Sequence, residues 1–154
     1  MPNTTLFTAF NFRVEISVPD LSSELCEAAF AECDGLEVNM EPKTFQEGGN
    51  NTAQVHLAGP VSYGQLTLRR GMTADFGLWR WFNELMKSDQ RKLRGQASIV
   101  MLAADRSTTQ VTFTLRDCLP VKMKAPALNA KEGLLAIEEM QIAYAALDVQ
   151  FPGS

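Results

Sequence analysis

Residues 63–82 read YGQLTLRRGMTADFGLWRWF, and two different hydrophobic periods meet within this stretch. In its first half, Leu66 and Leu68 alternate with polar residues, which predicts a strand with one buried face. In its second half the apolar residues recur at helical spacing, which predicts an α-helix over about residues 74–88. A strand that leads into a single amphipathic helix is therefore the first part of the expected fold.

The expected helix has a wide apolar face. Its large apolar side chains cover an arc of about 160°, whereas packing on one globular surface needs a stripe only somewhat wider than roughly 100°. The extra width predicts a helix that is covered on two sides, either by a second element of this chain or by a neighbouring subunit. Thr73 or Asp75 is placed to cap its N-terminus. The apolar residues are Leu78, Trp79, Trp81, Phe82, Leu85 and Met86.

Strand patterns occupy most of the remaining chain, so the residues alone predict a β-rich domain with one helix. Pro42 is expected at a strand edge or a bend, because proline cannot donate a backbone hydrogen bond to a ladder. Pro120 and Pro126 are expected to interrupt the chain after the last of these strands. The expected strands span residues 10–18, 28–35, 36–45, 63–70, 96–103 and 109–119.

The C-terminal segment, residues 134–149, reads LLAIEEMQIAYAALDV and is rich in good helix formers. Several of its apolar residues, among them Ile137, Met140 and Tyr144, also keep a helical spacing. Propensity alone therefore predicts a helix here.

The bulk properties fit one domain over residues 1–154. Of these 154 residues, 45% are hydrophobic and 21% are charged, which is enough apolar material for a core and argues against wholesale disorder. The net charge of -4 argues weakly against a nucleic-acid binder. No segment approaches the ~20 apolar residues of a membrane span, and the N-terminus lacks the pattern of a secretory signal. We expect a chain made in the cytoplasm without a signal peptide, with no membrane insertion of its own.

Residues that enzymes and metal sites commonly use are sparse. His56 is the single histidine, and no nucleophile motif accompanies it. Cys26, Cys33 and Cys118 are odd in number and show no CxxC spacing, so we expect reduced thiols in the core or half-buried, rather than disulfides or a zinc site. The sequence therefore predicts no enzyme, no metal and no cofactor.

Residues 45–60, FQEGGNNTAQVHLAGP, contain adjacent glycines and adjacent asparagines. A nest of backbone N–H groups could bind an anion, but the GxxxxGK[ST] motif of a phosphate-binding loop is missing. Glycine and asparagine tolerate positive φ, which predicts an irregular loop or hairpin tip. The central residues of this loop are Glu47, Gly48, Gly49, Asn50 and Asn51.

Three segments occur together in a known family. The EGGNN run at 47–51, the YGQLTLRRG segment at 63–71 and LWRWF at 78–82 resemble, in this order, the tail-tube proteins of contractile phages and phage-tail-like contractile injection systems. These are related in fold to the haemolysin-coregulated tube protein of type VI secretion. The chain departs from the family's usual leucine-proline-glycine at residues 57–59 and from its tryptophan-rich stretch at 118–123. Further matching segments are residues 12–16, 33–38, 57–60, 120–122, 128–130 and 136–139.

The resemblance implies a mainly β fold, an antiparallel β-barrel-like sandwich with one flanking helix over about residues 74–88. It also implies a strand from about Leu134, against the helix propensity of that segment. Members of the family form hexameric rings that stack into a hollow tube. The implied partners are further copies of this chain, sheath, baseplate and tube-terminator proteins, and cargo or DNA in the lumen. The implied location is an assembled injection particle or virion tail.

We therefore expect the loop at 45–60, with Glu47 to Asn51 at its centre, to contact a neighbouring subunit or the next ring. We also expect Trp79, Trp81 and Phe82 to divide between the core and an inter-subunit surface. A tube-initiator ring at the baseplate is an alternative within the family, and both a phage virion and an injection system stay open. A small-ligand-binding β-barrel is the alternative of another class, which would show a saturable site in the monomer and no polymer.

Overall fold

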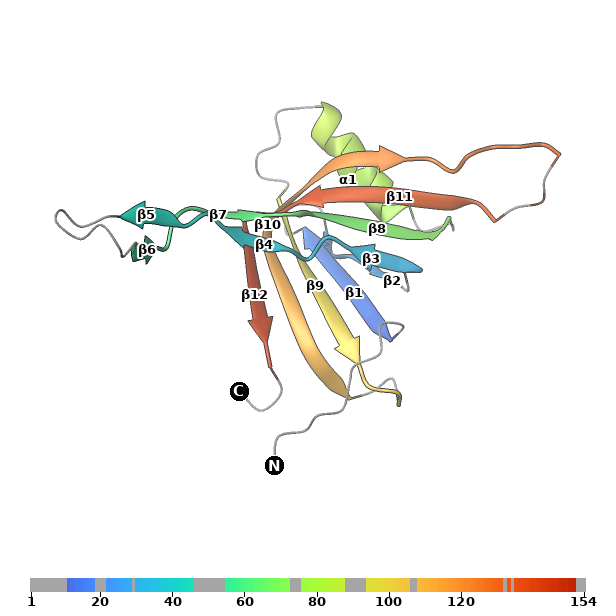
Figure 1. Ribbon diagram of the computed structural model, residues 1–154. Coiled ribbons are helices and arrows are strands. Elements are labelled where there is room, and N and C mark those ends of the chain that lie inside the picture. The colour runs from blue at the N-terminus through green and yellow to red at the C-terminus, as the bar shows by residue number, and fades with distance from the viewer. Residues whose placement is uncertain are drawn as a thin grey trace.

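The computed structural model of the chain consists mainly of antiparallel strands, with one helix packed on them (Figure 1). This confirms the mainly β fold with a flanking helix that the resemblance implied. The structure describes residues 11–18, 22–28, 30–45, 55–72, 76–87, 94–105, 108–131, 133 and 135–151.

The elements within these residues follow one another in chain order. The first part of the chain forms β1 (Phe12–Val18), β2 (Ser22–Ala28), β3 (Glu32–Asp34), β4 (Val38–Met40), β5 (Lys43–Phe45), β6 (Val55–Leu57), β7 (Val61–Tyr63) and β8 (Gln65–Gly71). The second part forms α1 (Gly77–Lys87), β9 (Gly95–Leu102), β10 (Thr109–Lys124), β11 (Ile137–Ala143) and β12 (Ala146–Gln150).

The long strand β10 joins two halves of the main sheet. Up to Cys118 it pairs with β9 along one edge, and β12 pairs along the other edge of the same part. From Leu119 to Lys124 it pairs with β11, which continues to β8 and β3. The full order is β2-β1-β9-β10-β11-β8-β3. Because β2 and β3 at its ends do not pair with each other, the described strands form an open sandwich rather than a closed barrel.

The two halves enclose one hydrophobic core. Alternate residues of each strand point into it, and Leu66 and Leu68 are both buried, as their alternation predicted. Each fully buried side chain of this size contributes about 1.5–3 kcal/mol relative to leaving it exposed. The most deeply buried side chains are Val14, Ile16, Val18, Leu66, Leu68, Leu78, Trp81, Leu115, Cys118, Met140 and Ile142.

The helix α1 packs against β10 and β2 and buries Leu78 and Trp81. Other members of its apolar arc are half-buried, but Met86 remains 65% exposed. The helix begins at Gly77, and its proposed caps Thr73 and Asp75 lie outside the described residues. No helix in the described part of the chain is long and apolar enough to cross a membrane.

Some strand boundaries differ from those expected. The strand β2 was not predicted, because its SSELCEA sequence has few strand-favouring residues and forms by pairing with β1. The expected strand at 28–35 shrinks to β3, and the expected strand at 36–45 divides into β4 and β5. Pro42 lies at that division, so the bend expected there is confirmed.

The prediction that Pro120 interrupts the chain is wrong, because β10 continues through it to Lys124. The pairing with β9 has ended at Cys118, and the register with β11 shifts between Pro120 and Lys122. Strand edges and bulges are the places where a sheet tolerates proline, which explains the continuity.

The helix predicted from propensity for the C-terminal segment is also wrong. The strand implied by the resemblance is confirmed and begins at Ile137, followed after a turn by β12. Met140 and Ile142 are buried and alternate with less buried residues, and β11 pairs with β8 on one edge and β10 on the other. Pairing along both edges outweighs helix propensity here.

Candidate functional site: two projecting arms and a charged sheet face

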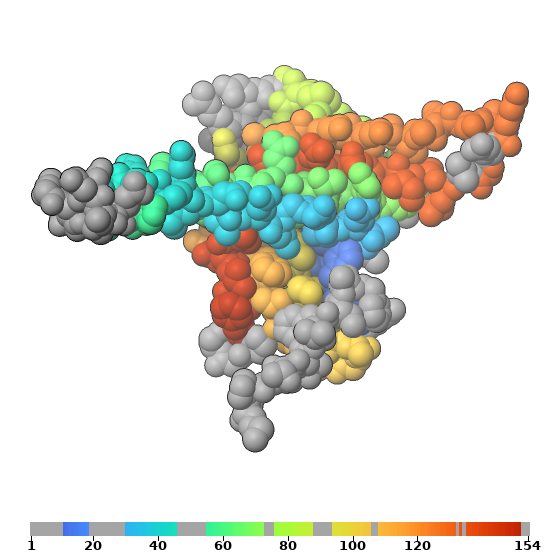
Figure 2. Space-filling model, viewed as in Figure 1, coloured from blue at the N-terminus to red at the C-terminus, as the bar shows by residue number. Residues whose placement is uncertain are grey.

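A two-stranded ribbon leaves the sheet beyond β3. In it β4 pairs with β7, which places Met40 opposite Val61, and β5 pairs with β6. We call residues 37–45 and 55–63 the ribbon arm, which projects from the body in Figures 1 and 2. No other described strand pairs with these four. An isolated two-stranded ribbon is at best marginally stable in water, so this arm lacks the support that the main sheet has.

Large apolar side chains of the ribbon arm face solvent. Their exposed fractions run from 43% at Val61 to 56% at Val38. Soluble monomers normally keep such patches small, so a row of exposed apolar side chains on a projecting element marks an interaction surface. The exposed set is Val38, Met40, Phe45, Val55, Leu57 and Val61.

The root of the ribbon arm is fixed to the body. The Tyr144 hydroxyl donates to the carbonyl oxygen of Gly35 at 2.8 Å and accepts from the Glu37 N–H at 3.1 Å. Its ring packs on Tyr63, with 5.5 Å between ring centres. Gly35 has a φ of 100°, and a side-chain carbon there would collide with the Gln65 carbonyl oxygen, so glycine is required. The arm therefore leaves the body in a defined direction.

A second projection forms where β10 and β11 extend beyond the body. We call residues 119–131, 133 and 135–137 the hairpin arm, which points away from the ribbon arm in Figure 1. Leu128 and Leu135 on it are 91% and 77% exposed. From Leu119 to Lys124, β10 pairs only with β11 among the described strands, so its other edge is open over this stretch.

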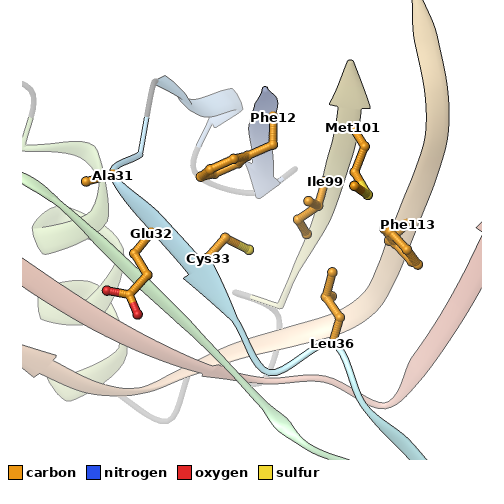
Figure 3. A pocket seen from close by; sticks show the side chains of 8 residues that line it. All are labelled: Phe12, Ala31, Glu32, Cys33, Leu36, Ile99, Met101 and Phe113. Carbon is orange, nitrogen blue, oxygen red and sulfur yellow. The ribbon is translucent and has the colours of Figure 1, made fainter. Parts of the chain in front are cut away.

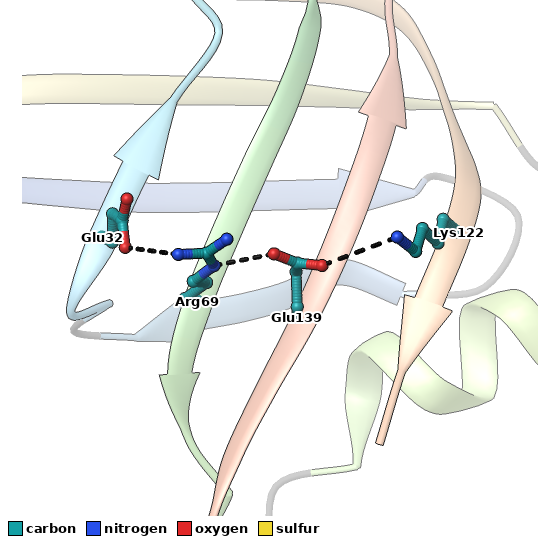
Figure 4. Close-up of polar contacts among 4 residues, drawn as sticks. All are labelled: Glu32, Arg69, Lys122 and Glu139. Carbon is teal, nitrogen blue, oxygen red and sulfur yellow. Dashed lines mark hydrogen bonds and ion pairs between the residues drawn. The ribbon is translucent and has the colours of Figure 1, made fainter. Parts of the chain in front are cut away.

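Charged residues of alternating sign cross the outer face of the sheet (Figure 4). The strand register places in one row Glu32 of β3, Arg69 of β8, Glu139 of β11 and Lys124 of β10. Arg69 contacts Glu139 at 2.7 Å and Glu32 at 3.1 Å, and Lys122 reaches Glu139 at 3.9 Å. The hydrogen bond from Arg69 is the main cause that lowers the pKa of Glu139. We call these five residues the charge row, which starts with a carboxylate at the β3 edge and ends with ammonium groups at the β10 edge.

On the opposite face, the neighbouring residues of the same two strands form a buried ion pair. Arg70 Nε lies 2.5 Å from Glu138 Oε1, and the two side chains are 4% and 2% exposed. The Trp79 indole N–H donates to the other Glu138 oxygen at 2.8 Å, which ties α1 to β11. The Arg70 guanidinium also lies 5.3 Å from the ring centre of Phe30. Successive strand residues point to opposite faces. Arg69 and Glu139 therefore lie on the outer face, whereas their neighbours Arg70 and Glu138 lie on the buried face.

A cavity of about 320 Å³ opens between β3 and the half of the sheet that contains β1, β9 and β10 (Figure 3). Burial raises the pKa of Cys33 to about 12, so this thiol stays protonated at neutral pH. The charged group on the lining, Glu32, already pairs with Arg69. Ligand pockets combine apolar walls with a few converging polar groups, and this cavity lacks that combination. Its lining is Phe12, Ala31, Glu32, Cys33, Leu36, Ile99, Met101 and Phe113.

The residues proposed from sequence as assembly contacts have different places. Trp81 is fully buried, and Trp79 is half-buried on Glu138. Trp81 has no exposed surface for another subunit, so it could affect assembly only by holding α1 in position. The remaining proposed residues lie outside the described residues, between β5 and β6, and their contact remains a prediction. They are Glu47, Gly48, Gly49, Asn50 and Asn51.

The projecting arms and the charge row offer contact surfaces. Within the described residues, no three metal-ligating side chains gather in one place. His56 is exposed on β6 of the ribbon arm. Cys33 and Cys118 are free thiols, as expected, and burial raises the pKa of Cys118 to about 12. Sequence reasoning did not predict that the ribbon arm projects from the body, because alternating apolar residues at 38–40 and 55–61 look like those of any half-buried strand.

The fold is similar to that of several solved structures. One match, with a TM-score of 0.83 and 23% identity, is a chain in the anti-feeding prophage baseplate, and covers 99% of this chain and 100% of that chain. Another, with a TM-score of 0.79 and 15% identity, is a chain in the extended sheath–tube complex of the extracellular contractile injection system PVC, covering 96% of this chain and 93% of that chain. Hcp1 from Flavobacterium johnsoniae matches with a TM-score of 0.50 and 12% identity, over 90% of this chain and 95% of that chain. These likenesses show the fold.

No curated protein sequence matches this chain significantly. The sequence profile of the T4-like virus tail tube protein gp19 family matches it over residues 8–148. That span takes in both arms, the charge row and the buried ion pair. The chain therefore belongs to the T4-like virus tail tube protein family, with a structural, tube-type role.

Proposed function

We propose that the chain is the inner tube subunit of a contractile injection system or phage tail, and that its copies form hexameric rings stacked around a lumen. The observation that carries this proposal is the ribbon arm. Its root is fixed by Tyr144, yet its large apolar side chains stay between 43% and 56% exposed within the described part of the chain. Because the chain belongs to a tail tube protein family, we infer that further copies of the same chain cover these apolar side chains.

The open sandwich suits such an assembly. Unpaired strand edges are prone to pair with another chain. In a closed ring of copies each of these edges pairs with a neighbouring copy, so that none stays exposed. Contacts between one ring and the next are heterologous, so they continue along an axis and build a tube. A subunit of this kind requires interfaces and a lumen surface, and no catalytic group, metal or cofactor.

A tube-initiator ring at the baseplate is the second candidate, and the likeness to a chain of a baseplate structure favours it. An initiator would form single rings that need another tube protein to extend them, whereas a main tube subunit stacks on its own. In both cases the partners are sheath, baseplate and terminator proteins, with cargo or DNA in the lumen, and the location is an assembled particle. The small-ligand-binding alternative rests on the cavity beside Cys33, whose charged lining residue, Glu32, already pairs with Arg69.

Negative-stain microscopy of the purified chain tests the proposal, which expects rings or stacked tubes. A variant that lacks Gly48 to Thr52 is expected to fold as a monomer and to form no tubes, since the loop would contact a neighbouring copy. Normal tubes from this deletion variant would remove the loop from the assembly account. A chain that stays monomeric at every concentration would contradict the proposal itself.

A further inference from the structure

We propose that the peptide between Asp34 and Gly35 is a modification site, where the chain isomerises spontaneously to isoaspartate and thereby releases the root of the ribbon arm. The reaction needs water and no enzyme, cofactor or oxidant. The inference concerns the chemistry of a single copy, so it does not depend on the tube proposed above.

The sequence distinguishes this peptide from the rest of the chain. Asp34 is the single aspartate or asparagine that a glycine follows. Isomerisation begins when the backbone nitrogen of the following residue attacks the side-chain carboxyl carbon. A side chain on that residue hinders the attack, and glycine has none. The other six aspartates precede larger residues, so they serve as references within the same chain.

The structure brings the two reacting groups together. The Gly35 N–H donates to Asp34 Oδ1 at 2.7 Å, which places the nitrogen next to the carboxyl carbon that it would attack. Holding two reacting groups in contact removes the entropy cost of bringing them together. Rotation about χ2 of aspartate, which is a broad torsion, turns the face of the carboxyl group toward the nitrogen. Asp34 is exposed, so water reaches the site.

The reaction balances with water alone. The Gly35 nitrogen forms a bond to Asp34 Cγ and loses its proton, and a carboxyl oxygen leaves as water, which closes a cyclic imide. Water then adds to one of the two carbonyl carbons of the imide. Cleavage at the side-chain carbonyl restores aspartate. Cleavage at the main-chain carbonyl gives isoaspartate, in which the backbone runs through the side chain and is one carbon atom longer.

The longer backbone does not fit the root of the ribbon arm. Gly35 has a φ of 100°, and its Cα lies so close to the Gln65 carbonyl oxygen that a side-chain carbon would collide with it. The Tyr144 hydroxyl donates to the Gly35 carbonyl oxygen at 2.8 Å and accepts from the Glu37 N–H at 3.1 Å. An additional backbone atom directly before Gly35 displaces both partners of that hydroxyl. Isomerisation therefore breaks the contact that sets the direction of the arm (Figure 1).

Ageing of the unassembled chain at neutral pH tests the site. Peptide mapping by mass spectrometry locates isoaspartate, and methylation by an isoaspartyl methyltransferase measures its amount. We expect isoaspartate to accumulate at Asp34 at least about tenfold faster than at any other aspartate. Asp34→Glu is the control and should remove the signal, because the additional methylene group separates the reacting atoms. Asp34→Asn should accelerate the reaction, since ammonia then leaves in place of water.

A synthetic peptide of residues 30–38 separates the contribution of the fold from that of the sequence. The peptide contains the same Asp-Gly pair without the contact between its reacting groups, so the folded chain should isomerise no more slowly than the peptide. A folded chain that isomerises about tenfold more slowly would show that the observed geometry does not promote the reaction.

Hydrogen exchange of the Glu37 amide tests the release of the arm. This amide should lose protection at least about tenfold in isomerised chains, whereas the amide of Leu66 in the core should keep its protection. Tyr144→Phe lacks the hydroxyl and should reproduce the loss at Glu37 without any isoaspartate.

Two results would overturn the inference. One is isoaspartate spread evenly over the aspartates of the aged chain, which would remove the site. The other is an isomerised chain whose Glu37 amide is as protected as before, which would remove the release of the arm. Both measurements use single copies, so neither result changes the test of the proposed function.

Discussion

The sandwich core and the two arms are built from the same kind of strand but end in opposite environments. In the core, alternating apolar residues such as Leu66 and Ile142 are completely buried by the facing half of the sheet. In the ribbon arm, residues in similar patterns stay open to solvent, and Val38 reaches an exposed fraction of 56%. The difference shows that hydrophobic alternation defines a face but does not specify what covers it. The core is complete within one copy, and the arms are the part that we assign to contacts between copies.

The largest effect on a single copy is expected from Trp81→Ala. Trp81 is fully buried between α1 and the sheet, so its truncation should lower the free energy of unfolding by about 3–5 kcal/mol. Chemical denaturation of the unassembled chain measures this. Phe76→Ala at the exposed start of the helix is the control and should change stability by no more than about 0.5 kcal/mol. Equal effects of the two substitutions would contradict the assignment of Trp81 to the core.

Breaking the buried ion pair is expected to have an effect of similar size. Glu138→Ala leaves Arg70 charged and buried, which should cost about 3–5 kcal/mol of unfolding free energy. Replacing both partners, by Arg70→Met with Glu138→Leu, removes the unpaired charge and should be far closer to neutral. Denaturation of both variants separates these outcomes. A double variant as unstable as Glu138→Ala would show that the pair is not the reason for the loss.

A substitution in the ribbon arm should change the stability of a single copy little and impair assembly strongly. Met40→Ser changes a side chain that is 54% exposed, so the unfolding free energy should move by no more than about 0.5 kcal/mol. Assembly, followed by sedimentation and microscopy, should be lost because the covering contact is lost. Met86→Ser on α1, at a side chain 65% exposed, is the matched control and should assemble normally. If both variants assemble equally well, the ribbon arm is not a covering contact.

The charge row should give the smallest effect, because its ion pairs are exposed to solvent and screened. The pKa of Glu139 is lowered in the folded chain from an ordinary value of 4.5, so its contribution to stability is present above about pH 4.5 and is lost as the pH falls through the lowered pKa. Arg69→Gln should therefore be slightly less stable than the wild type at neutral pH, and this gap should close in acid. A gap that widens on acidification would show that the Arg69–Glu139 contact is not its source.

How far the sequence alone predicts this molecule depends on whether a feature is local. The alternation of Leu66 and Leu68 and the helix that contains Trp81 follow from periodicity, because one segment contains the whole signal. The strand β11 does not, because pairing with β8 and β10 outweighs its helix propensity. The Arg70–Glu138 pair is invisible for a related reason, since its partners are 68 residues apart.

The arms show a different limit of prediction from sequence. Exposed residues such as Val38 and Val55 follow a pattern that also fits a strand in a core, and whether they are covered depends on other molecules. The resemblance to tail-tube proteins predicted that the loop at residues 47–51 contacts neighbouring copies. This loop lies outside the described residues. The structure adds neighbouring surfaces, the ribbon arm and the two charged edges, that no motif indicated.

Hydrogen exchange of the assembled and the unassembled chain tests the central claim most directly. We expect backbone amides of the ribbon arm, of β3 and of residues 119–124 to exchange rapidly in the single copy and to become protected on assembly. Core amides of β1 and β9, which are already paired on both edges, should change little. Protection that leaves both arms and both edges unchanged on assembly would contradict the account.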